Sequence, residues 1–242
     1  MSWRGHSGEA LARVLGLPRV LAVHAVESTM DAAHQLAADD APAGTLVVAE
    51  EQYAGRGRGG RAWTSRPGAG IWMTLIERPR ESAGLDVLSL RVGLHLAPVL
   101  ERWAPGDVRL KWPNDLYIAR RKLAGVLIEA RWHGGRPDWV AIGLGINVRP
   151  PADVAEAIGL SADPEEVLAE VIPALRAAAF AEGPLTESEL LDFARRDLAL
   201  GHHVLAPADG FVRGISASGE LLLEADGRVT PFRAGSLVFA TN

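Results

Sequence analysis

Two lysines stand apart in a chain that otherwise uses arginine for positive charge. Of its 25 lysines and arginines, only Lys111 and Lys122 are lysine, and the other 23 are arginine. Lysine carries a compact, strongly hydrated ammonium that can point at one oxygen, whereas arginine presents a planar fork. A composition this biased would replace a lysine that served only as a generic charge. We therefore interpret both positions as functional rather than as a chance pairing of rare residues.

A short glycine- and arginine-rich segment supplies a second cationic group. Residues 55–61 read Gly-Arg-Gly-Arg-Gly-Gly-Arg, which places three guanidinium groups and four glycines in seven positions. Glycine allows backbone N–H groups to approach a ligand closely and to form an anion-binding concavity. Arginine adds bidentate donors for phosphate or carboxylate. The pattern is typical of a site that handles a polyphosphate together with a carboxylate.

Other classes of glycine-rich segment require a different context. A dinucleotide-binding GxGxxG must open a helix, and here Pro67 and Gly68 oppose one. A Walker A loop requires Gly-Lys-Ser/Thr, which this segment lacks. A flexible Arg-Gly segment that binds RNA normally lies in a longer disordered tail. This one is expected between two buried strands, where loops commonly carry function.

Composition narrows the class of protein further. The formal net charge is −5, which argues against bulk nucleic-acid binding. The absence of cysteine excludes disulfides, thiolate catalysis and cysteine-ligated zinc. The first twenty residues lack a signal-peptide pattern, and no window approaches the ~20 apolar residues of a membrane span. We expect a soluble, cytoplasmic protein that does not associate with membranes.

Hydrophobic periodicity and turn residues predict the elements that position these groups in the first two thirds of the chain. A helix should run from Ser28 or Thr29 to about residue 38, and a core helix capped by Asp86 should run to residue 103. Strands are expected over residues 20–26, 45–50, 71–76, 108–111, 116–118, 123–130 and 139–143.

The last third changes character. Cap signals at Asp163-Pro164 and at Thr186 predict helices over residues 164–180 and 187–198. Beyond residue 201 only short β-like pieces broken by glycine remain, which predicts a small barrel of SH3 type. Its five strands are expected over residues 203–206, 211–216, 221–224, 229–232 and 236–240.

Four motifs, in their order and spacing, resemble the biotin–protein ligase (biotin-[acetyl-CoA-carboxylase] ligase) family. They occupy residues 51–63, 110–117, 121–129 and 143–148. The resemblance implies an α+β fold with a mixed-sheet catalytic domain of the biotin/lipoate ligase type, related to class II synthetases. We expect this domain over residues 1–198 and a C-terminal SH3-like β domain over residues 199–242. Only about twenty residues precede the first strand, so we expect a short form without a DNA-binding domain and no DNA binding.

The resemblance implies an ATP-dependent ligase that works in two steps. Biotin and ATP, with Mg²⁺, would give biotinyl-5′-AMP and pyrophosphate, and a lysine of a biotin carboxyl carrier domain of acetyl-CoA carboxylase or a related carboxylase would then attack the mixed anhydride. No tightly bound prosthetic group is expected. Lipoate or octanoyl transfer and RNA binding are the alternatives; the Gly-Arg-Gly-Arg loop favours biotin and the acidic charge disfavours RNA. An exposed edge strand would suit a homodimer, and the sequence leaves the oligomeric state open.

The resemblance also implies roles for individual residues. Lys122 and Arg58 would be catalytic, with Lys122 beside the biotin carboxylate and the α-phosphate and Arg58 clamping the phosphate. Biotin would be bound by Ser28, Thr29, Met30, Gln52, Gly55, Arg56, Gly57, Arg58, Lys122 and Gly125. ATP would be bound by Arg58, Arg61, Trp63, Lys111, Asn114 and Asn147.

Structural roles compete with some of these assignments. Ser28 and Thr29 would also serve as helix caps, and Trp63 would also serve as a core residue. Met30 stands where the family often has asparagine, which removes a side-chain hydrogen bond at that position. Two roles stay open for Asp115, namely coordination of Mg²⁺ and orientation of Lys122 or an arginine.

Overall fold

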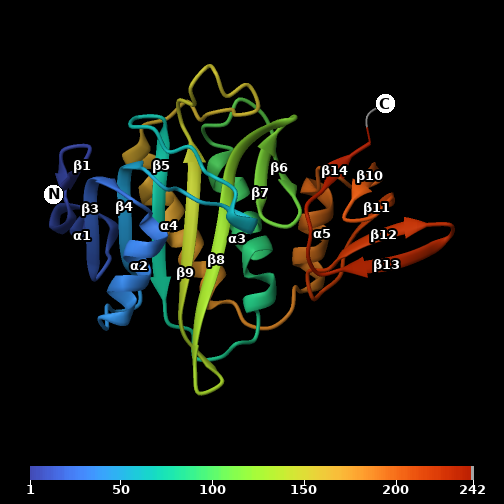
Figure 1. The fold of residues 1–242 in the computed structure, drawn as a ribbon, viewed down its shortest axis with the longest axis horizontal. Coiled ribbons are helices and arrows are strands. Elements are labelled where there is room, and N and C mark those ends of the chain that lie inside the picture. Colours follow the sequence, from blue (N-terminus) through green and yellow to red (C-terminus); the bar gives the residue numbers. More distant parts are fainter. Residues whose placement is uncertain (241–242) are drawn as a thin grey trace.

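A mixed seven-stranded sheet forms the main body of the computed structural model, which describes residues 1–240 (Figure 1). β3 and β4 are parallel, and every other neighbouring pair in this sheet is antiparallel. Across the sheet, the strands lie in the order β3 (Arg19–Val26), β4 (Thr45–Gln52), β5 (Gly70–Glu77), β9 (Arg136–Asn147), β8 (Arg121–His133), β7 (Asp115–Ile118) and β6 (Val108–Lys111). All seven predicted strands are present; β8 and β9 are longer than expected and form a hairpin that projects beyond the sheet.

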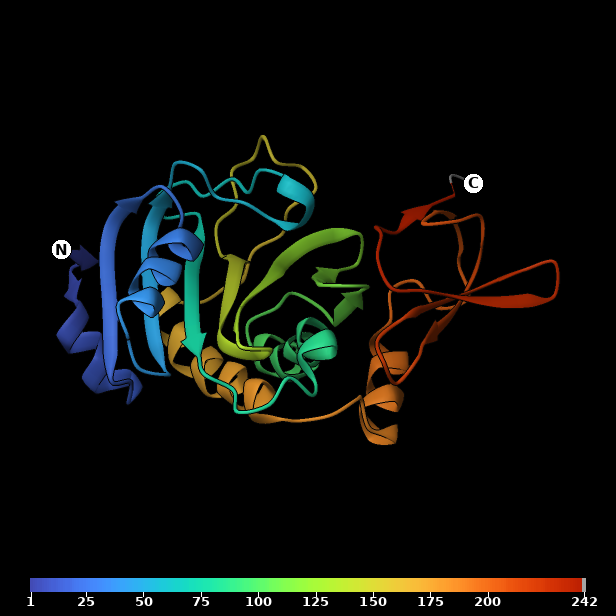
Figure 2. The same ribbon diagram turned by 60° about the horizontal axis from the view of Figure 1, so that its bottom comes forward.

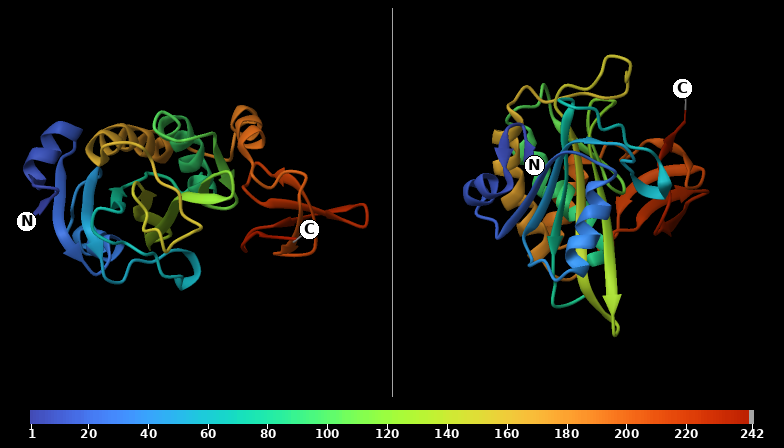
Figure 3. Two further views of the ribbon diagram at one scale, coloured as in Figure 1. Left: turned by 90° about the horizontal axis from the view of Figure 1, so that it is seen from above. Right: turned by 60° about the vertical axis from the view of Figure 1, so that its left-hand side comes forward.

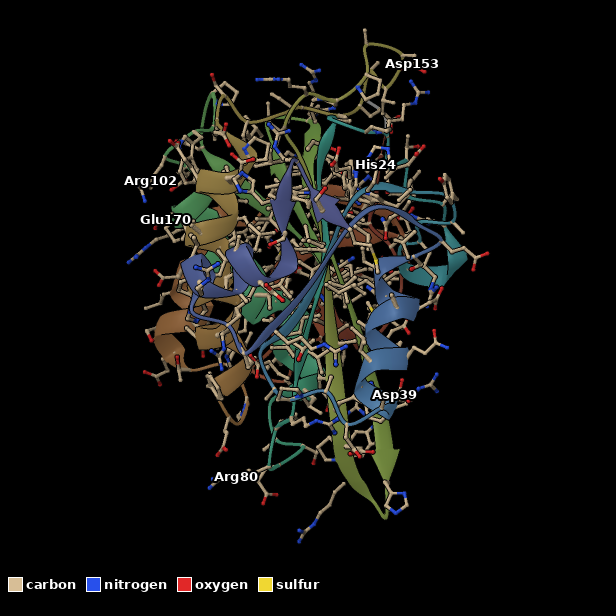
Figure 4. All side chains as sticks on the ribbon, turned by 90° about the vertical axis from the view of Figure 1, so that its left-hand side faces the viewer. His24, Asp39, Arg80, Arg102, Asp153 and Glu170 are labelled. Carbon is tan, nitrogen blue, oxygen red and sulfur yellow. The ribbon has the colours of Figure 1, made fainter. Side chains whose placement is uncertain are left out.

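The helices cover the two faces of the sheet unequally (Figure 3). α1 (Gly8–Leu15), α3 (Leu88–Leu100) and α4 (Pro164–Phe180) pack on one face over the main hydrophobic core. α2 (Thr29–Ala38) packs on the other face against β4, β5 and β9, with Asp39 just beyond its end (Figure 4). Because α2 is a single short helix, part of this second face stays free for a site.

Local sequence signals account for most helix ends. Asp163 caps α4 by accepting a hydrogen bond from the backbone N–H of Glu165, and Pro164 occupies the first turn. α5 (Glu187–Arg196) begins with a complete capping box between Thr186 and Glu189, as predicted, and ends two residues earlier than expected. These caps satisfy backbone N–H groups that have no partner inside the helix.

Other helix predictions need correction. The helix expected from Asp86 begins instead with a 3₁₀ turn, η2 (Leu85–Val87), and Val87 rather than Asp86 is the N-cap of α3. Ser28 precedes α2 as predicted, but its hydroxyl makes no capping hydrogen bond. The sequence prediction missed α1, which follows a two-stranded hairpin of β1 (Ser2–Trp3) and β2 (His6–Ser7), although Ser7 caps its start.

The C-terminal region folds into a separate five-stranded antiparallel sheet, in keeping with the predicted SH3-like domain. The order is β13 (Arg228–Phe232), β12 (Leu221–Ala225), β11 (Gly210–Ile215), β10 (His203–Ala206) and β14 (Val238–Phe239). This sheet lies beside the β6 edge of the main sheet, next to α5 (Figure 2). The expected boundary between residues 198 and 199 falls in the connection from α5 to β10. No helix within residues 1–240 is long and apolar enough to cross a bilayer.

Candidate functional site

A cavity of about 240 Å³ lies on the α2 face of the sheet, beneath the loop that joins β4 to β5. Residues 236–238 of the C-terminal sheet form part of its wall. Gly55 and Asn147 lie behind the wall rather than on it. The other fourteen predicted site residues line the cavity: Ser28, Thr29, Met30, Gln52, Arg56, Gly57, Arg58, Arg61, Trp63, Lys111, Asn114, Asp115, Lys122 and Gly125.

One end of the cavity is a network of neutral hydrogen-bonding side chains. The side-chain oxygen of Gln52 accepts hydrogen bonds from the backbone N–H of Thr29 (2.8 Å) and from its hydroxyl (3.0 Å). The Gln52 amide nitrogen donates to Ser65 Oγ at 2.8 Å, and the Thr29 hydroxyl lies 2.9 Å from that of Thr74. Because each bond constrains the next, the amide of Gln52 has one favoured orientation toward a ligand.

Sequence reasoning missed Ser65 and Thr74. Thr74 carried a usable signal, since it is the one polar residue within the apolar stretch Ile71–Ile76 of a buried strand. A hydroxyl at such a position needs a hydrogen-bond partner. Ser65 carried no comparable signal, because its role depends on a loop that folds back to pair with Gln52.

The other end of the cavity holds Lys122. Its ammonium lies 2.8 Å from Asp115 Oδ1 and 4.8 Å from the centroid of the Trp63 ring. The contact with Asp115 is an ion pair between partly buried side chains. The backbone of Lys122 is also fixed, because its N–H donates to the carbonyl of Glu156 at 2.6 Å.

Lys111 is a desolvated cation on the same wall. Its ammonium lies 5.4 Å from the ring centroid of Tyr117 and 5.5 Å from that of Phe239, a residue of the C-terminal sheet. Burial lowers the pKa of Lys111 below its ordinary value. Within residues 1–240 it forms no salt bridge, so an anionic ligand is the charge partner that this position lacks.

The three loop arginines differ in how far they are neutralised. The guanidinium of Arg56 turns toward α2 and donates to both carboxylate oxygens of Asp31 at 2.6 Å. Arg58 has no salt-bridge partner in the described part of the chain, and burial lowers its pKa. Among the described residues, the guanidinium of Arg61 donates only to Ser236 Oγ, at 3.3 Å. Two of the three guanidiniums are therefore available to an anion.

Missing side chains at two glycines make room for the indole of Trp63. A Cβ atom at Gly125 would lie 2.9 Å from the indole, and one at Gly145 would lie 2.6 Å from it. At the loop tip, Gly59 and Gly60 take positive φ angles of 66° and 73°, which favour glycine. At Gly125 and Gly145 the indole of Trp63 rests directly on the backbone of β8 and β9, and its Nε1 is buried without a hydrogen-bond partner among the described residues.

The two predicted asparagines hold the backbone around Lys122. Asn114 Nδ2 donates to the carbonyl of Val126 at 2.7 Å, and Asn147 Nδ2 donates to the carbonyl of Lys122 at 3.0 Å. Their amide nitrogens are thus committed to the protein. Of the two, only Asn114 lines the cavity.

Asp115 is the acidic residue on the cavity wall. Among the described residues, no group of three histidine, aspartate or glutamate side chains gathers into a metal site. Mg²⁺ commonly uses one or two carboxylates together with substrate phosphates and water. One partly buried carboxylate, that of Asp115, fits that mode and does not fit a resident metal held by protein alone.

Comparisons with known proteins agree with this geometry. Residues 22–147 match the model of the biotin/lipoate A/B protein ligase family. The bifunctional ligase/repressor BirA of Salmonella typhimurium is 36% identical over 80% of this chain, and the chain spans 66% of that protein's length. The biotin–[acetyl-CoA-carboxylase] ligase of Paracoccus denitrificans is 32% identical over 73% of this chain and 82% of that protein.

Solved structures give the same result. The biotin protein ligase of Aquifex aeolicus, determined in complex with biotin and ATP, aligns with a TM-score of 0.78 and 27% identity. The alignment covers 91% of this chain and 99% of the Aquifex chain. On the family model, which spans more than half of the sequence, and on these relatives, the chain belongs to the biotin/lipoate A/B protein ligase family, as a ligase of the biotin–protein ligase type.

Proposed function

We propose that this protein is an ATP-dependent biotin–protein ligase that forms biotinyl-5′-AMP and then biotinylates a lysine of a biotin carboxyl carrier domain of acetyl-CoA carboxylase or a related carboxylase. One observation carries the proposal. A single cavity joins the neutral hydrogen-bonding network of Thr29 and Gln52 to a group of cations that includes Lys122 and Arg58. The neutral end suits the ureido ring of biotin, and the cationic end suits a carboxylate meeting a triphosphate.

The first step requires two anions to approach each other. A carboxylate oxygen of biotin attacks the α-phosphorus, the new O–P bond forms, and the bond to the bridging oxygen breaks to release pyrophosphate. Lys122 would lie against the oxygens that carry the developing charge, and Arg58 would clamp the phosphate. Preorganised cations in a water-poor site stabilise such a transition state without reorganisation.

ATP would occupy the end of the cavity near the C-terminal sheet. The desolvated ammonium of Lys111 and the guanidinium of Arg61 would meet the phosphates, while Trp63 would stack on the adenine. Mg²⁺ would enter with the nucleotide and reduce its negative charge, and Asp115 is the residue that would help to hold it. The same carboxylate would keep Lys122 oriented before the nucleotide arrives.

The second step transfers the acyl group. The neutral amine of the acceptor lysine attacks the carbonyl carbon of the mixed anhydride, so that a C–N bond forms, the C–O bond breaks, AMP leaves with the electron pair of that bond, and the amine loses one proton to solvent. Lys122 and Arg58 would again stabilise the negative oxygens of the phosphate. The glycine loop over the cavity would keep water from the anhydride until the acceptor arrives.

Incubation with ATP, Mg²⁺, biotin and a purified carrier domain tests the proposal. Intact mass should show one added biotinyl group on the carrier, and omission of ATP should abolish it. Lipoate serves as the control substrate. We expect no transfer of lipoate, because the similar ligases of Paracoccus denitrificans and Aquifex aeolicus are biotin ligases. A carrier that stays unmodified, or one that gains lipoate instead of biotin, would refute the proposal.

A further inference from the structure

The guanidinium of Arg56 is turned away from the cationic end of the cavity and sits in a cluster of side chains from four elements. Asp31 and His34 come from one face of α2, Glu129 comes from β8, and Trp139 comes from β9. Together with Arg56 of the loop, we call these five residues the Arg56 clasp. Arg56 contacts Asp31 and Glu129 directly, His34 and Trp139 lie behind Glu129, and a long hydrogen bond of 3.5 Å also joins Arg56 Nη1 to Ser28 Oγ.

Arg56 is held by two carboxylates at once. Its Nη1 and Nη2 donate to the two oxygens of Asp31, each at 2.6 Å, and its Nε lies 3.5 Å from Glu129 Oε1. The bidentate geometry with Asp31 fixes the plane of the guanidinium as well as its position. The same hydrogen bond lowers the pKa of the Asp31 carboxyl, so this residue stays ionised at neutral pH. A guanidinium that is neutralised on two sides is poorly placed to bind a phosphate.

The second carboxylate is fixed by a hydrogen-bond relay. Trp139 Nε1 lies 2.9 Å from His34 Nδ1, and an indole N–H can only donate. His34 Nδ1 therefore accepts, and its Nε2–H donates to Glu129 Oε2 at 2.9 Å. The side chains of His34 and Trp139 are largely buried, so the relay starts from a rigid point on β9.

The loop needs such a tether because its backbone is paired mainly with itself. Within the loop, Trp63 N–H donates to the carbonyl of Gly55 and Gly57 N–H donates to that of Arg61, both at 2.8 Å. These bonds shape a hairpin but do not hold its tip against the sheet. Trp63 packs its indole on the sheet near the C-terminal end of the loop, and the loop arginines whose side chains bond outside the loop are Arg56 on the α2 side and Arg61, through Ser236, on the other.

We propose that Asp31 and Glu129, with His34 and Trp139 behind them, are positioning residues that hold the glycine loop closed over the cavity through Arg56. In this role Arg56 anchors the side of the loop that lies next to α2, and it does not bind an anionic ligand. The clasp would slow the escape of the reactive adenylate and leave the chemical step to Lys122 and Arg58. This last consequence rests on the proposed function; the closure of the loop does not.

Hydrogen exchange of the loop amides in the unliganded protein tests the clasp without reference to any substrate. Asp31→Asn should speed exchange over residues 55–61 by about threefold to tenfold, the range that corresponds to a partly exposed, bidentate ion pair. Glu170→Gln is the control, because the similarly exposed carboxylate of Glu170 pairs with Arg102 at 3.0 Å on α4, which packs on the opposite face of the sheet. Equal exchange in these two variants would overturn the clasp.

Two further variants separate positioning from general destabilisation. Asp31→Glu keeps a carboxylate for Arg56 and should keep exchange close to that of the parent, whereas a role for Asp31 that does not involve the ion pair would leave this variant as mobile as Asp31→Asn. Trp139→Phe removes the N–H that orients His34 but keeps an aromatic ring. It should speed loop exchange less than Asp31→Asn does, and an unchanged rate would remove the relay from the proposal.

A second measurement follows the adenylate. After biotin, ATP and Mg²⁺ are mixed and the excess is removed, Asp31→Asn should release biotinyl-5′-AMP about threefold to tenfold faster than the parent, with its melting temperature unchanged. If the parent forms no adenylate, the proposed function fails and the exchange result still decides the clasp. If the parent forms the adenylate and Asp31→Asn releases it as slowly as the parent does, the clasp has no role in retention.

Discussion

Lys122 and Asp115 meet across the β7–β8 hairpin, with 2.8 Å between Nζ and Oδ1. The residue directly opposite Asp115 is Gly125, and a Cβ atom there would lie 3.2 Å from both the Asp115 oxygen and the Lys122 Cε. The absence of a side chain at Gly125 thus gives the lysine room to lie diagonally and reach the carboxylate. The motif residues Asp115, Lys122 and Gly125 act as one steric unit that aims an ammonium into the cavity.

The first prediction is that position 122 requires lysine and that arginine cannot replace it. Lys122→Arg keeps the charge but replaces a point donor with a wider planar fork, which does not fit between Asp115 and the Trp63 ring. We expect adenylation, measured as biotin-dependent ATP–pyrophosphate exchange, to fall by about 100-fold or more. Arg121→Lys, the reverse exchange at the exposed neighbouring position, should leave the rate near that of the parent. Near-normal exchange by Lys122→Arg would contradict our interpretation of the two lysines.

The second prediction is that Arg58 retains the intermediate, biotinyl-5′-AMP, in the cavity. Its guanidinium is half-buried and has no carboxylate partner among the described residues, so the adenylate phosphate is its expected counter-ion. Arg58→Gly should release biotinyl-5′-AMP and biotinylate bystander proteins, detected by streptavidin blotting of a mixture with serum albumin. Arg66→Gly is the control, since Arg66 pairs with Asp153 on the outer surface of the same loop. Equal bystander labelling by the two variants would rule out the clamp.

The contact between Gly145 and Trp63 gives the third prediction. Gly145→Ala places a methyl group 2.6 Å from the indole, so the ring must move off the sheet. Overpacking of this kind costs about 1–3 kcal/mol, and we expect the KM for ATP to rise by about tenfold, with a smaller change in the KM for biotin. Gly106→Ala, where the nearest atom would lie at an ordinary 3.4 Å, should change neither constant. An unchanged KM for ATP in Gly145→Ala would separate Trp63 from nucleotide binding.

A buried carboxyl at the junction of the two sheets gives the fourth prediction. Burial raises the pKa of Asp197 from 3.8 to about 6, and its Oδ2 has no partner. The folded state therefore holds this proton more tightly than the unfolded state does. The stabilising contribution of the protonated Asp197 carboxyl to the free energy of unfolding is therefore fully present below pH 4. This contribution falls by about 2–3 kcal/mol as the pH rises to 6 and above.

Urea denaturation between pH 4 and pH 7 measures this contribution. Asp197→Asn removes the titrating group and keeps an oxygen to accept the hydrogen bond that Ala199 N–H donates at 2.8 Å. The variant should thus gain stability relative to the parent as the pH rises through 6. Asp107→Asn, on an exposed turn, should follow the parent at every pH. Parallel profiles for parent and Asp197→Asn would show that the carboxyl does not titrate in this range.

Local information was sufficient for most elements of the fold, although α1 and the hairpin before it were missed. The cap at Asp163-Pro164 and the capping box at Thr186 set the starts of α4 and α5, because these signals act within a few residues. The same holds for the turns that separate the short C-terminal strands. The weak point was the start of α3, where Asp86 has the composition of a cap but lies in a 3₁₀ turn that the packing of Val87 determines.

The sequence by itself identified the candidate residues for the chemistry, since lysine at only two positions and a Gly-Arg-Gly-Arg loop are properties of residue type and spacing. Only the tertiary structure decided what each of them contacts. Arg56 and Arg58 are indistinguishable in sequence, yet Arg56 is bound by Asp31 whereas Arg58 is free of any carboxylate in the described chain. The reason is that strand register and helix placement bring together groups far apart in the chain, such as Arg61 and Ser236, and no short-range pattern encodes those distances.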